Sequence, residues 1–384
     1  MKNQDDGDQE RIPCVIMRGG TSKGIFFDEG DLPSDPRSRE RLILSIMGSP
    51  DPRQIDGLGG ADPLTSKICI IGPGAAFDAD CTYTFGQVGI DEPYVALAGN
   101  CGNLSAAVGV YAVEQGLAPA IEPETVVRIY NTNARQILIA RVPVRDGRPM
   151  VTGDYVIAGV PGSGAEIRMD YSRTSGATTG SVLPTGRSRD RIHVAELGRD
   201  VEISIVDVAK ATCFFNARDV GLTGTEGPDA FTAEILARFW AIRNAAARYI
   251  GLSPDSRLPT PVAVAEPAPY ENYMTKEIVP AEAVSFVARR VIGPPPRLHK
   301  AFASTGAVCT AVASRLEGTI VHAVSKPPVD DLVRIGHPSG VFPVKIVLDA
   351  AGTLLEASYS RTARRIMEGT VLVPRERLRS DTAR

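Results

Sequence analysis

Two segments far apart in the chain repeat the same pattern of small residues. GNCGNLSAAVGVYAVEQGL occupies 99–117 and ASTGAVCTAVASRLEGTI occupies 303–320. When Gly102 is laid over Gly306, the alanines and valines that follow fall in step. Each segment also closes on a glycine suited to ending a helix, Gly116 and Gly318. The repeat predicts two equivalent buried helices, and so constrains the chain to a duplicated fold.

A second match lies upstream of each small-residue segment. Residues 12–32 and 202–222 share one layout, with a strand, a short turn, a second strand, an acidic loop and then a helix. Two matches in the same order predict two similar lobes, 1–190 and 191–370, with 371–384 as a tail that packs back on the first lobe. Since ligand sites favour domain interfaces, we expect the active site in the cleft between the lobes.

Short strand-like runs alternate with few helices along the whole chain. Apolar spacing typical of helices occurs in four places, 36–48, 103–115, 229–250 and 303–315. Between them the chain carries many short apolar runs, punctuated by 37 glycines and 29 prolines. This differs from the regular strand and helix alternation of a doubly wound sheet. We therefore expect an α/β (α+β) protein with curled, mixed or antiparallel sheets.

Composition excludes several classes of partner. The net charge of −3 offers no basic excess for nucleic acid, and no run of about 18 apolar residues could cross a membrane. The six cysteines form no CxxC pair, so neither a disulfide framework nor a metal site is indicated. No dinucleotide or phosphate-loop spacing suggests a cofactor. We expect a cytoplasmic protein that binds a small molecule. Two copies of the chain could form a homodimer.

The first candidate for chemistry is Asn100-Cys101-Gly102-Asn103, at the start of the first small-residue helix. The free N–H groups and positive end of that helix favour a thiolate over a thiol, and can also hold a substrate carboxylate. Cys101 is thus a candidate acid or base. The alternative is a buried cysteine that only begins a helix, since free cysteines are commonly small core residues.

The second candidate is Lys67, at the head of the apolar run KICIIG. A Gly- and Asp-rich loop, 56–66, leads into it and ends on Ser66. If the run is a core strand, Lys67 is nearly buried, and burial of an ammonium lowers its pKa toward the range useful for proton transfer. The alternative is an ordinary lysine at a strand end that extends to solvent.

A third candidate is the turn Arg18-Gly19-Gly20-Thr21-Ser22 between two strands. Its guanidinium, hydroxyls and glycine-exposed N–H groups suit an anion such as a carboxylate. A plain hairpin turn is the alternative, because Gly and Ser are common turn residues. Two weaker polar turns of the second half could also bind anions or cap structure: Ser304-Thr305-Gly306 and His337-Pro338-Ser339.

The repeat is asymmetric in chemistry. Thr305 occupies the position equivalent to Cys101, and an unactivated aliphatic hydroxyl is too weak an acid to carry a proton at neutral pH. A symmetric two-thiol epimerase is therefore disfavoured. The acid and base pair that remains is Cys101 with Lys67.

These motifs closely resemble the PrpF family, which includes 2-methylaconitate cis-trans isomerase, 4-oxalomesaconate tautomerase and 3-methylitaconate Δ-isomerase. The resemblance covers nearly the whole chain and is carried by MRGGTSKGIFF (17–27), MGSPDPRQIDGLGGADPLTSK (47–67), YTFGQVGIDEPYV (83–95), GNCGNLSAAVGVYAVEQGL (99–117), LPTG (183–186), GLTGTE (221–226), KAFASTGAVCTAVA (300–313), RIGHPSG (334–340) and SRTARRIMEG (360–369). It implies the diaminopimelate epimerase fold, in which each lobe is a sheet curled around a central helix.

The resemblance also implies roles for residues. Lys67 and Cys101 would be the catalytic pair, moving a proton on an allylic system without a cofactor. Carried over by motif, the carboxylate binders would be Arg18, Thr21, Ser22, Gly102, Asn103, Thr305, Gly306, His337 and Ser339. Their neighbours complete the expected substrate site: Gly19, Gly20, Ser66, Asn100, Leu104, Ser304 and Pro338.

Different motifs resemble different named branches of the family. GGADPLTSK resembles the tautomerases, whereas FGQVGIDEPYV, GNCGNLSAAVG and RIGHPSG are more similar to the methylaconitate isomerases. We expect an isomerase of a small unsaturated di- or tricarboxylate, with its named substrate open. Two other hypotheses remain, a racemase or epimerase of an amino or hydroxy acid, and a non-catalytic polycarboxylate-binding partner of an aconitase-like enzyme.

Overall fold

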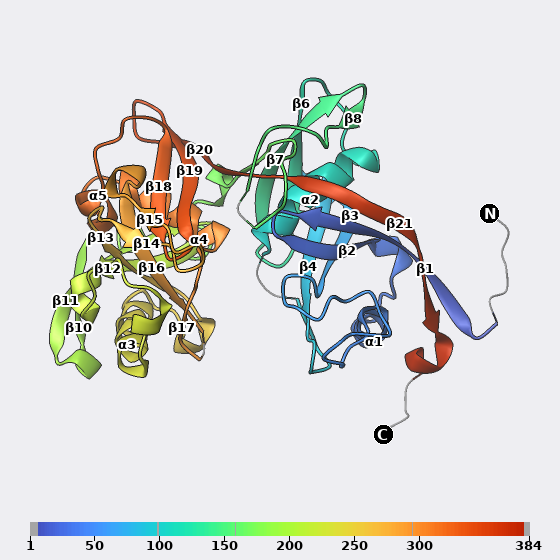
Figure 1. Ribbon diagram of the computed structural model, residues 1–384, viewed down its shortest axis with the longest axis horizontal. Helices are drawn as coiled ribbons and strands as arrows, with labels where there is room; N and C mark the ends of the chain where they lie inside the picture. Colours follow the sequence, from blue (N-terminus) through green and yellow to red (C-terminus); the bar gives the residue numbers. More distant parts are fainter. Residues whose placement is uncertain (1–6, 98–99, 158, 294, 380–384) are drawn as a thin grey trace. The chain divides into compact units, whose positions relative to one another are not determined.

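The computed structural model describes residues 7–97, 100–157, 159–293 and 295–379, which form two compact units (Figure 1). The first unit holds the chain up to Met169 and again from Ser360, and the second unit runs from Asp170 to Tyr359. The division thus differs from the expected 1–190 and 191–370. Strand pairing explains the difference, because the C-terminal strand completes the sheet of the first unit.

The sheet of the first unit is ordered β21, β1, β2, β3, β4, β6 and β7. Their bounds are β1 Gln9–Gly19, β2 Ser22–Asp28, β3 Lys67–Pro73, β4 Cys81–Val88, β6 Glu124–Asn131, β7 Gln136–Arg145 and β21 Ala363–Pro374. β21 pairs antiparallel with β1 from Gly19↔Ala363 to Gln9↔Pro374. Beyond it, the 3₁₀ turn η9 (Arg375–Leu378) contacts α1 (Pro36–Met47). The expected tail therefore packs on the first unit as far as it is described, and 380–384 lie outside the described residues.

The sheet of the second unit is ordered β10, β11, β12, β13, β16, β18, β19 and β20. Their bounds are β10 Asp190–Val194, β11 Arg199–Val208, β12 Lys210–Asn216, β13 Thr260–Ala265, β16 Phe286–Ile292, β18 Leu332–His337, β19 Gly340–Leu348 and β20 Leu354–Arg361. The shorter elements of the chain are β5 Val95–Ala96, β8 Arg148–Pro149, β9 Ile167–Asp170, β14 Tyr270–Glu271, β15 Ile278–Val279, β17 Arg297–Leu298 and α5 Ile320–Val324.

The two units repeat one sequence of strand pairings. From β1 to β7 the pairings run antiparallel, parallel, antiparallel, parallel and antiparallel. From β11 to β19 the pairings follow the same order. The residues that close the second strand of each hairpin also match, since Asp28 and Asn216 each cap a 3₁₀ turn with their side chains. The internal repeat read from the sequence is thus a repeat of topology.

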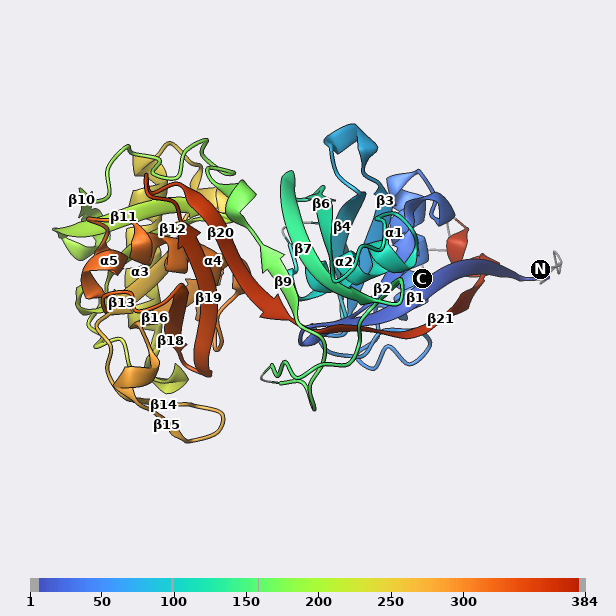
Figure 2. The same cartoon turned by 90° about the horizontal axis from the view of Figure 1, so that it is seen from above.

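Each unit encloses one small-residue helix. These are α2 (Gly102–Glu114) and α4 (Ser304–Arg315), close to the expected 103–115 and 303–315. Within α2 every residue from Leu104 to Val113 is buried, so the helix has no polar face and needs cover on all sides. Strands β1, β2, β3, β6, β7 and β21 supply it, as Figure 2 shows.

Small side chains let the strands approach these helices closely. A Cβ added to Gly109 of α2 would lie 2.6 Å from the Cβ of Ala140 on β7. The outer helices are amphipathic instead, and their ends carry ordinary caps. Asp35 accepts from the Ser38 N–H at the start of α1, and Thr232 accepts from the Ile235 N–H at the start of α3 (Ala233–Tyr249).

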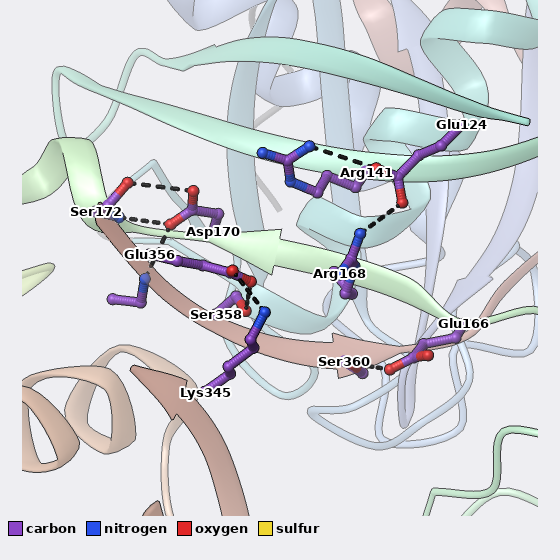
Figure 3. A network of polar contacts seen from close by, with 11 residues as sticks. Glu124, Arg141, Glu166, Arg168, Asp170, Ser172, Lys345, Glu356, Ser358 and Ser360 are labelled. Carbon is purple, nitrogen blue, oxygen red and sulfur yellow. Dashed lines mark hydrogen bonds and ion pairs between the residues drawn. The ribbon is translucent and has the colours of Figure 1, made fainter. Parts of the chain in front are cut away.

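The chain passes from the first unit to the second after Met169 and returns after Tyr359. Near both points, polar contacts hold each segment to its own unit (Figure 3). In the first unit Arg168 and Arg141 both bond Glu124, at 2.8 and 3.4 Å, and Ser360 donates to Glu166 at 2.5 Å. In the second unit the Ser172 and Ala357 N–H groups donate to Asp170, while Lys345 bonds Glu356 at 2.9 Å. Each segment next to a crossing is thereby fixed within its unit.

Over the residues that are described, none of the helices combines the length and the apolar character that a membrane span requires.

Candidate active site

The turn between β1 and β2 lies against the first turn of α2. The Asn103 Nδ2 group donates to Oγ1 of Thr21 at 2.9 Å and to Oγ of Ser22 at 3.5 Å. The thiol of Cys101, the residue that precedes α2, lies 3.9 Å from the same Ser22 oxygen. Four of the expected site residues therefore form one cluster, although they come from two separate parts of the sequence.

The two glycines of the turn are required by this close approach. A Cβ at Gly19 would lie 2.4 Å from the backbone oxygen of Asn103, and one at Gly20 would lie 2.3 Å from its Oδ1. Gly20 also has a φ of 51°, which favours glycine. Any side chain at either position would push the turn away from α2.

Arg18 is bonded to the backbone on both sides of the turn. Its Nη1 group donates to the carbonyl oxygens of Gly20 at 3.0 Å and Thr362 at 2.8 Å. Burial, and then the charge of Arg364, lower the pKa of the guanidinium. Arg18 therefore ties the turn to the chain just before β21, and the geometry assigns it to positioning the site.

Lys67 is nearly buried at the start of β3, with 8% of the residue exposed. Its Nζ donates to Oε1 of Gln87 at 2.5 Å and lies 5.2 Å from the centre of the Phe85 ring. Gln87 is held in turn, because its Nε2 group donates to the backbone oxygen of Ser66 at 2.8 Å. Among the described residues, no carboxylate forms an ion pair with Lys67. The amine thus has neutral partners in a nearly dry setting.

Ser66 supports the loop that leads to Lys67. It is fully buried, and its hydroxyl donates to the Val88 carbonyl at 3.1 Å and accepts from Gln54 Nε2 at 2.8 Å. Gln54 also accepts from the Ala61 N–H at 2.9 Å. These contacts fix the loop from inside, so the structure gives Ser66 a supporting place rather than a surface that meets a ligand.

Cys69 connects Lys67 and Cys101 electrostatically. It stands two residues after Lys67 and so shares the same face of β3. Burial raises the pKa of the Cys69 thiol well above its usual value, and the charge of Cys101 raises it further. The Tyr83 hydroxyl and the charge of Lys67 act in the opposite direction. Both Cys101 and Lys67 therefore affect the pKa of the Cys69 thiol.

Packing across Gly24 brings the first turn of α2 next to Lys67. A Cβ at Gly24 would lie 2.9 Å from Cδ1 of Leu104 and 3.3 Å from the backbone oxygen of Lys67. Leu104 therefore helps to set the depth of α2 against β3. Asn100 fixes the approach to the helix, because its Oδ1 accepts from the Ser105 hydroxyl at 2.9 Å.

Cys101 differs from the other cysteines in exposure. It is partly exposed, whereas the remaining five are buried: Cys14, Cys69, Cys81, Cys213 and Cys309. The Cys101 side chain makes no capping hydrogen bond to the first turn of α2. This arrangement suits a thiol that exchanges a proton beside an anion.

The expected residues of the second unit gather in two places within that unit. Ser304 and Thr305 begin α4 and are partly exposed, and Gly306 is buried against Arg290. Ala303 precedes the helix without a side-chain cap. The start of α4 thus resembles the start of α2, since the side chain of the residue before each helix makes no capping hydrogen bond.

His337 is the buried last residue of β18, next to the turn that leads to β19. Burial, and then the charges of Arg289 and His299, lower its pKa to about 3. Its Nδ1 accepts from the Ser339 N–H at 3.2 Å, and the Ser339 hydroxyl donates to the Lys300 carbonyl at 2.5 Å. His337 is therefore neutral at ordinary pH and shapes the turn. Pro338 contributes its carbonyl, which accepts from the Tyr273 N–H.

Several residues of these sites were not predicted from the sequence. Gln87 and Phe85 hold Lys67, Arg361 donates to Oδ1 of Asn103 at 2.9 Å, and Arg290 packs on Gly306. A polar residue inside an apolar strand, as in YTFGQV and FVARRVI, was the available signal. Within the described part of the chain, no group of three or more His, Cys, Asp or Glu side chains could hold a metal ion.

Comparison with known proteins identifies similar chains over almost the full length. The model of the family described as PrpF protein matches residues 9–374. A 3-methylitaconate isomerase of Eubacterium barkeri is 47% identical over 383 residues, which covers 97% of this chain and 99% of the relative. A 4-oxalomesaconate tautomerase of Pseudomonas putida is 38% identical over 372 residues, with coverage of 96% and 98%.

Solved structures agree with these matches. The crystal structure of a methylitaconate Δ-isomerase has a TM-score of 0.89 at 46% identity, and covers 98% of this chain and 99% of the other. A hydroxyproline epimerase of Agrobacterium vitis has a TM-score of 0.51 at 13% identity, with coverage of 95% and 93%. The second likeness shows the fold alone, which is the expected diaminopimelate epimerase-like fold.

Proposed function

Because the chain belongs to the PrpF family, we propose that it is an isomerase that shifts a proton along the allylic system of a small unsaturated di- or tricarboxylate. The relatives carry the names of isomerases and tautomerases of such acids. The reaction breaks a C–H bond on a carbon beside the double bond. The electron pair of that bond forms a new double bond to the neighbouring carbon. The electron pair of the old double bond then forms a C–H bond with a proton added at the far carbon.

Lys67 takes the proton in this proposal. In its neutral form the amine can donate one N–H to Gln87 and keep its lone pair for the substrate carbon. Phe85 packs beside the amine and limits its contact with solvent. Gln87 fixes the direction of Nζ, because its own amide is anchored on the Ser66 carbonyl. A near-buried amine without an acidic partner is the observation that carries the proposal.

Cys101 donates its thiol proton at the other end of the allylic system. Lys67 then carries the proton taken from the substrate, and the two groups regain their starting protonation states before the next turnover. The position of Cys101 before α2 places it beside the N–H groups that would hold the adjacent carboxylate. The same N–H groups, with the Thr21 and Ser22 hydroxyls, stabilise the negative charge that develops when the C–H bond breaks. Asn103 orients both hydroxyls through its amide.

A panel of acids in D2O tests the proposal. Wild-type protein is incubated with itaconate, 2-methylaconitate, cis-aconitate and trans-aconitate, and 1H NMR follows deuterium at each carbon. We expect exchange at the two allylic carbons of at least one acid, together with its isomer. Exchange with none of these acids, by a protein that is folded by circular dichroism, would remove the proposed reaction.

A further inference from the structure

Arg290 of the second unit is a buried cation without a partner. Only 3% of the residue is exposed, yet its Nε and Nη1 groups have no hydrogen-bond acceptor among the described residues. Burial lowers the pKa of its guanidinium to about 10, which leaves it charged at neutral pH. A buried charge of this kind is costly without an opposite charge or a set of acceptors. The described residues supply neither an ion-pair partner nor acceptors for Nε and Nη1.

The guanidinium is aimed at the start of α4. A Cβ added to Gly306 would lie 2.2 Å from Nη1 of Arg290 and 2.8 Å from Cζ. Gly306 is the third residue of this helix of 12 residues, whose start has no side-chain cap. The unpartnered donors of Arg290 therefore lie beside the backbone of Gly306 in the first turn of α4.

Strand registers show which residue of the first unit Arg290 replaces. Across the first sheet, Phe26 pairs with Cys69 and Cys69 with Phe85. Across the second sheet, Phe214 pairs with Val262 and Val262 with Arg290. Since Phe26 and Phe214 stand at the same distance before the capping residues Asp28 and Asn216, Arg290 is the counterpart of Phe85. A cation thus stands where the first unit places the ring beneath Lys67.

A second cation belongs to the same cluster. Lys210 begins β12 at the position that Ser22 holds in β2, and its ammonium has no hydrogen-bond or ion-pair partner in the described ranges. Burial, then the charges of Arg290 and Arg257, lower its pKa to about 8. The counterpart of Lys67 is Thr260, a buried residue whose hydroxyl also lacks a partner.

The surrounding titratable groups do not neutralise the two cations. His299 lies beside Arg290, and burial followed by that charge lowers its pKa to about 4, so it is neutral. Asp207 lies on neighbouring β11. Its Oδ2 accepts from the N–H groups of Thr178 and Thr179 and from the Thr179 hydroxyl, and its Oδ1 has no hydrogen-bond partner among the described residues. This single negative charge is outnumbered by the cations Arg290, Lys210 and Arg257. Cys309 on α4 has a pKa raised by burial and is protonated. The cluster therefore keeps a net positive charge.

We propose that Arg290 and Lys210, with the N–H groups at the start of α4, form a carboxylate-binding site in the second unit. Identifying the bound group as a carboxylate of the unsaturated acid rests on the proposed function. The positive charge of this site would favour ligands that carry carboxylates. Thr305, the counterpart of Cys101, would bind at this site without carrying a proton.

The test compares the wild type with Arg290→Met and Lys210→Met. Binding of trans-aconitate, itaconate and inorganic phosphate is measured by calorimetry, and Tm is measured without ligand. We expect Arg290→Met to weaken binding of the unsaturated acids at least tenfold and Lys210→Met to weaken it several-fold. Ligand-free Tm should be unchanged or higher in both variants, because an uncompensated cation has been removed.

Arg289→Met is the matched control on the same strand. Arg289 is also buried, but it donates to the carbonyls of Glu226 and Ala288 at 2.8 and 3.0 Å. Its loss should lower Tm, the opposite sign to Arg290→Met. Arg290→Met that binds the acids with wild-type affinity would overturn the site, as would a wild type that binds only phosphate or none of the three ligands. Arg290-dependent binding without deuterium exchange would uphold the site and reject only the proposed reaction.

Discussion

Lys67 and Gln87 face each other directly across the β3–β4 ladder, and their side chains meet at 2.5 Å. The amine of Lys67 therefore has an amide oxygen as its acceptor, where an ion pair would have supplied a carboxylate. A carboxylate would favour the charged ammonium and remove the base. Gln87 therefore fixes the position of the Lys67 amine without adding an opposite charge.

Gln87→Glu should impair the enzyme in a pH-dependent way. A glutamate would stabilise the Lys67 ammonium, so activity at pH 7 should fall at least ~10-fold and recover as pH rises. The pH profile of kcat for the isomerised acid measures this. A profile that falls in height without moving along the pH axis would show that Gln87 acts only on the position of the loop.

Cys101→Ala should reduce kcat by ~100-fold or more, with little change in KM, because it removes a proton carrier and leaves the carboxylate contacts in place. Cys69→Ala is the matched control, since Cys69 is a buried thiol on the same face as Lys67. It should cost stability and retain a kcat near that of the wild type. Equal losses of kcat in both variants would contradict the assignment of Cys101.

Arg18→Met should lower stability more than it raises KM. The variant loses two bonds from a charged donor to the Gly20 and Thr362 carbonyls, so unfolding in urea should show a loss of about 2 kcal/mol. If Arg18 instead binds the substrate directly, KM would rise strongly with no loss of stability. The two measurements on one variant separate these roles.

Acid should destabilise the second unit through His337 and His299. Their pKa values in the folded protein are about 3 and about 4, below the usual 6.5, so the unfolded chain binds more protons than the folded chain below pH 6.5. Stability should fall as pH drops from 6.5 toward 3, and the two groups have no effect above that range.

His337→Asn tests this acid sensitivity. The side-chain oxygen of the asparagine can replace Nδ1 as the acceptor for the Ser339 N–H. Unlike the imidazole, the amide does not take up a proton in this pH range. The difference in Tm between pH 7 and pH 5 should therefore be smaller than in the wild type. The same Tm difference in both proteins would mean that other groups cause the acid loss.

The sequence predicted the elements whose signal is local. Small residues in 103–115 and 303–315 gave the two central helices within a residue or two of their ends. The apolar run after Lys67 likewise indicated a core strand, and Lys67 is indeed nearly buried. Such patterns need only the burial of neighbouring residues, so a single stretch of chain carries them.

The contacts that could not be predicted from the sequence involve partners far apart along the chain. Gln87 meets Lys67 only because of the register of β3 with β4, and Arg290 meets Gly306 only because α4 lies over β16. One acceptor of Arg18, the Thr362 carbonyl, likewise lies far along the chain. For the same reason the boundaries of the units were misplaced, because only the pairing of β21 with β1 brings the C-terminal segment to the first unit.

Deuterium exchange by Lys67→Ala tests the central claim most directly. The variant is compared in D2O with wild type and with Lys23→Ala, a lysine of neighbouring β2 that has no part in the proposed reaction. We predict that Lys67→Ala, folded and able to bind the acid, loses allylic exchange by at least ~100-fold, and that Lys23→Ala exchanges like wild type. Wild-type exchange in Lys67→Ala would contradict the account.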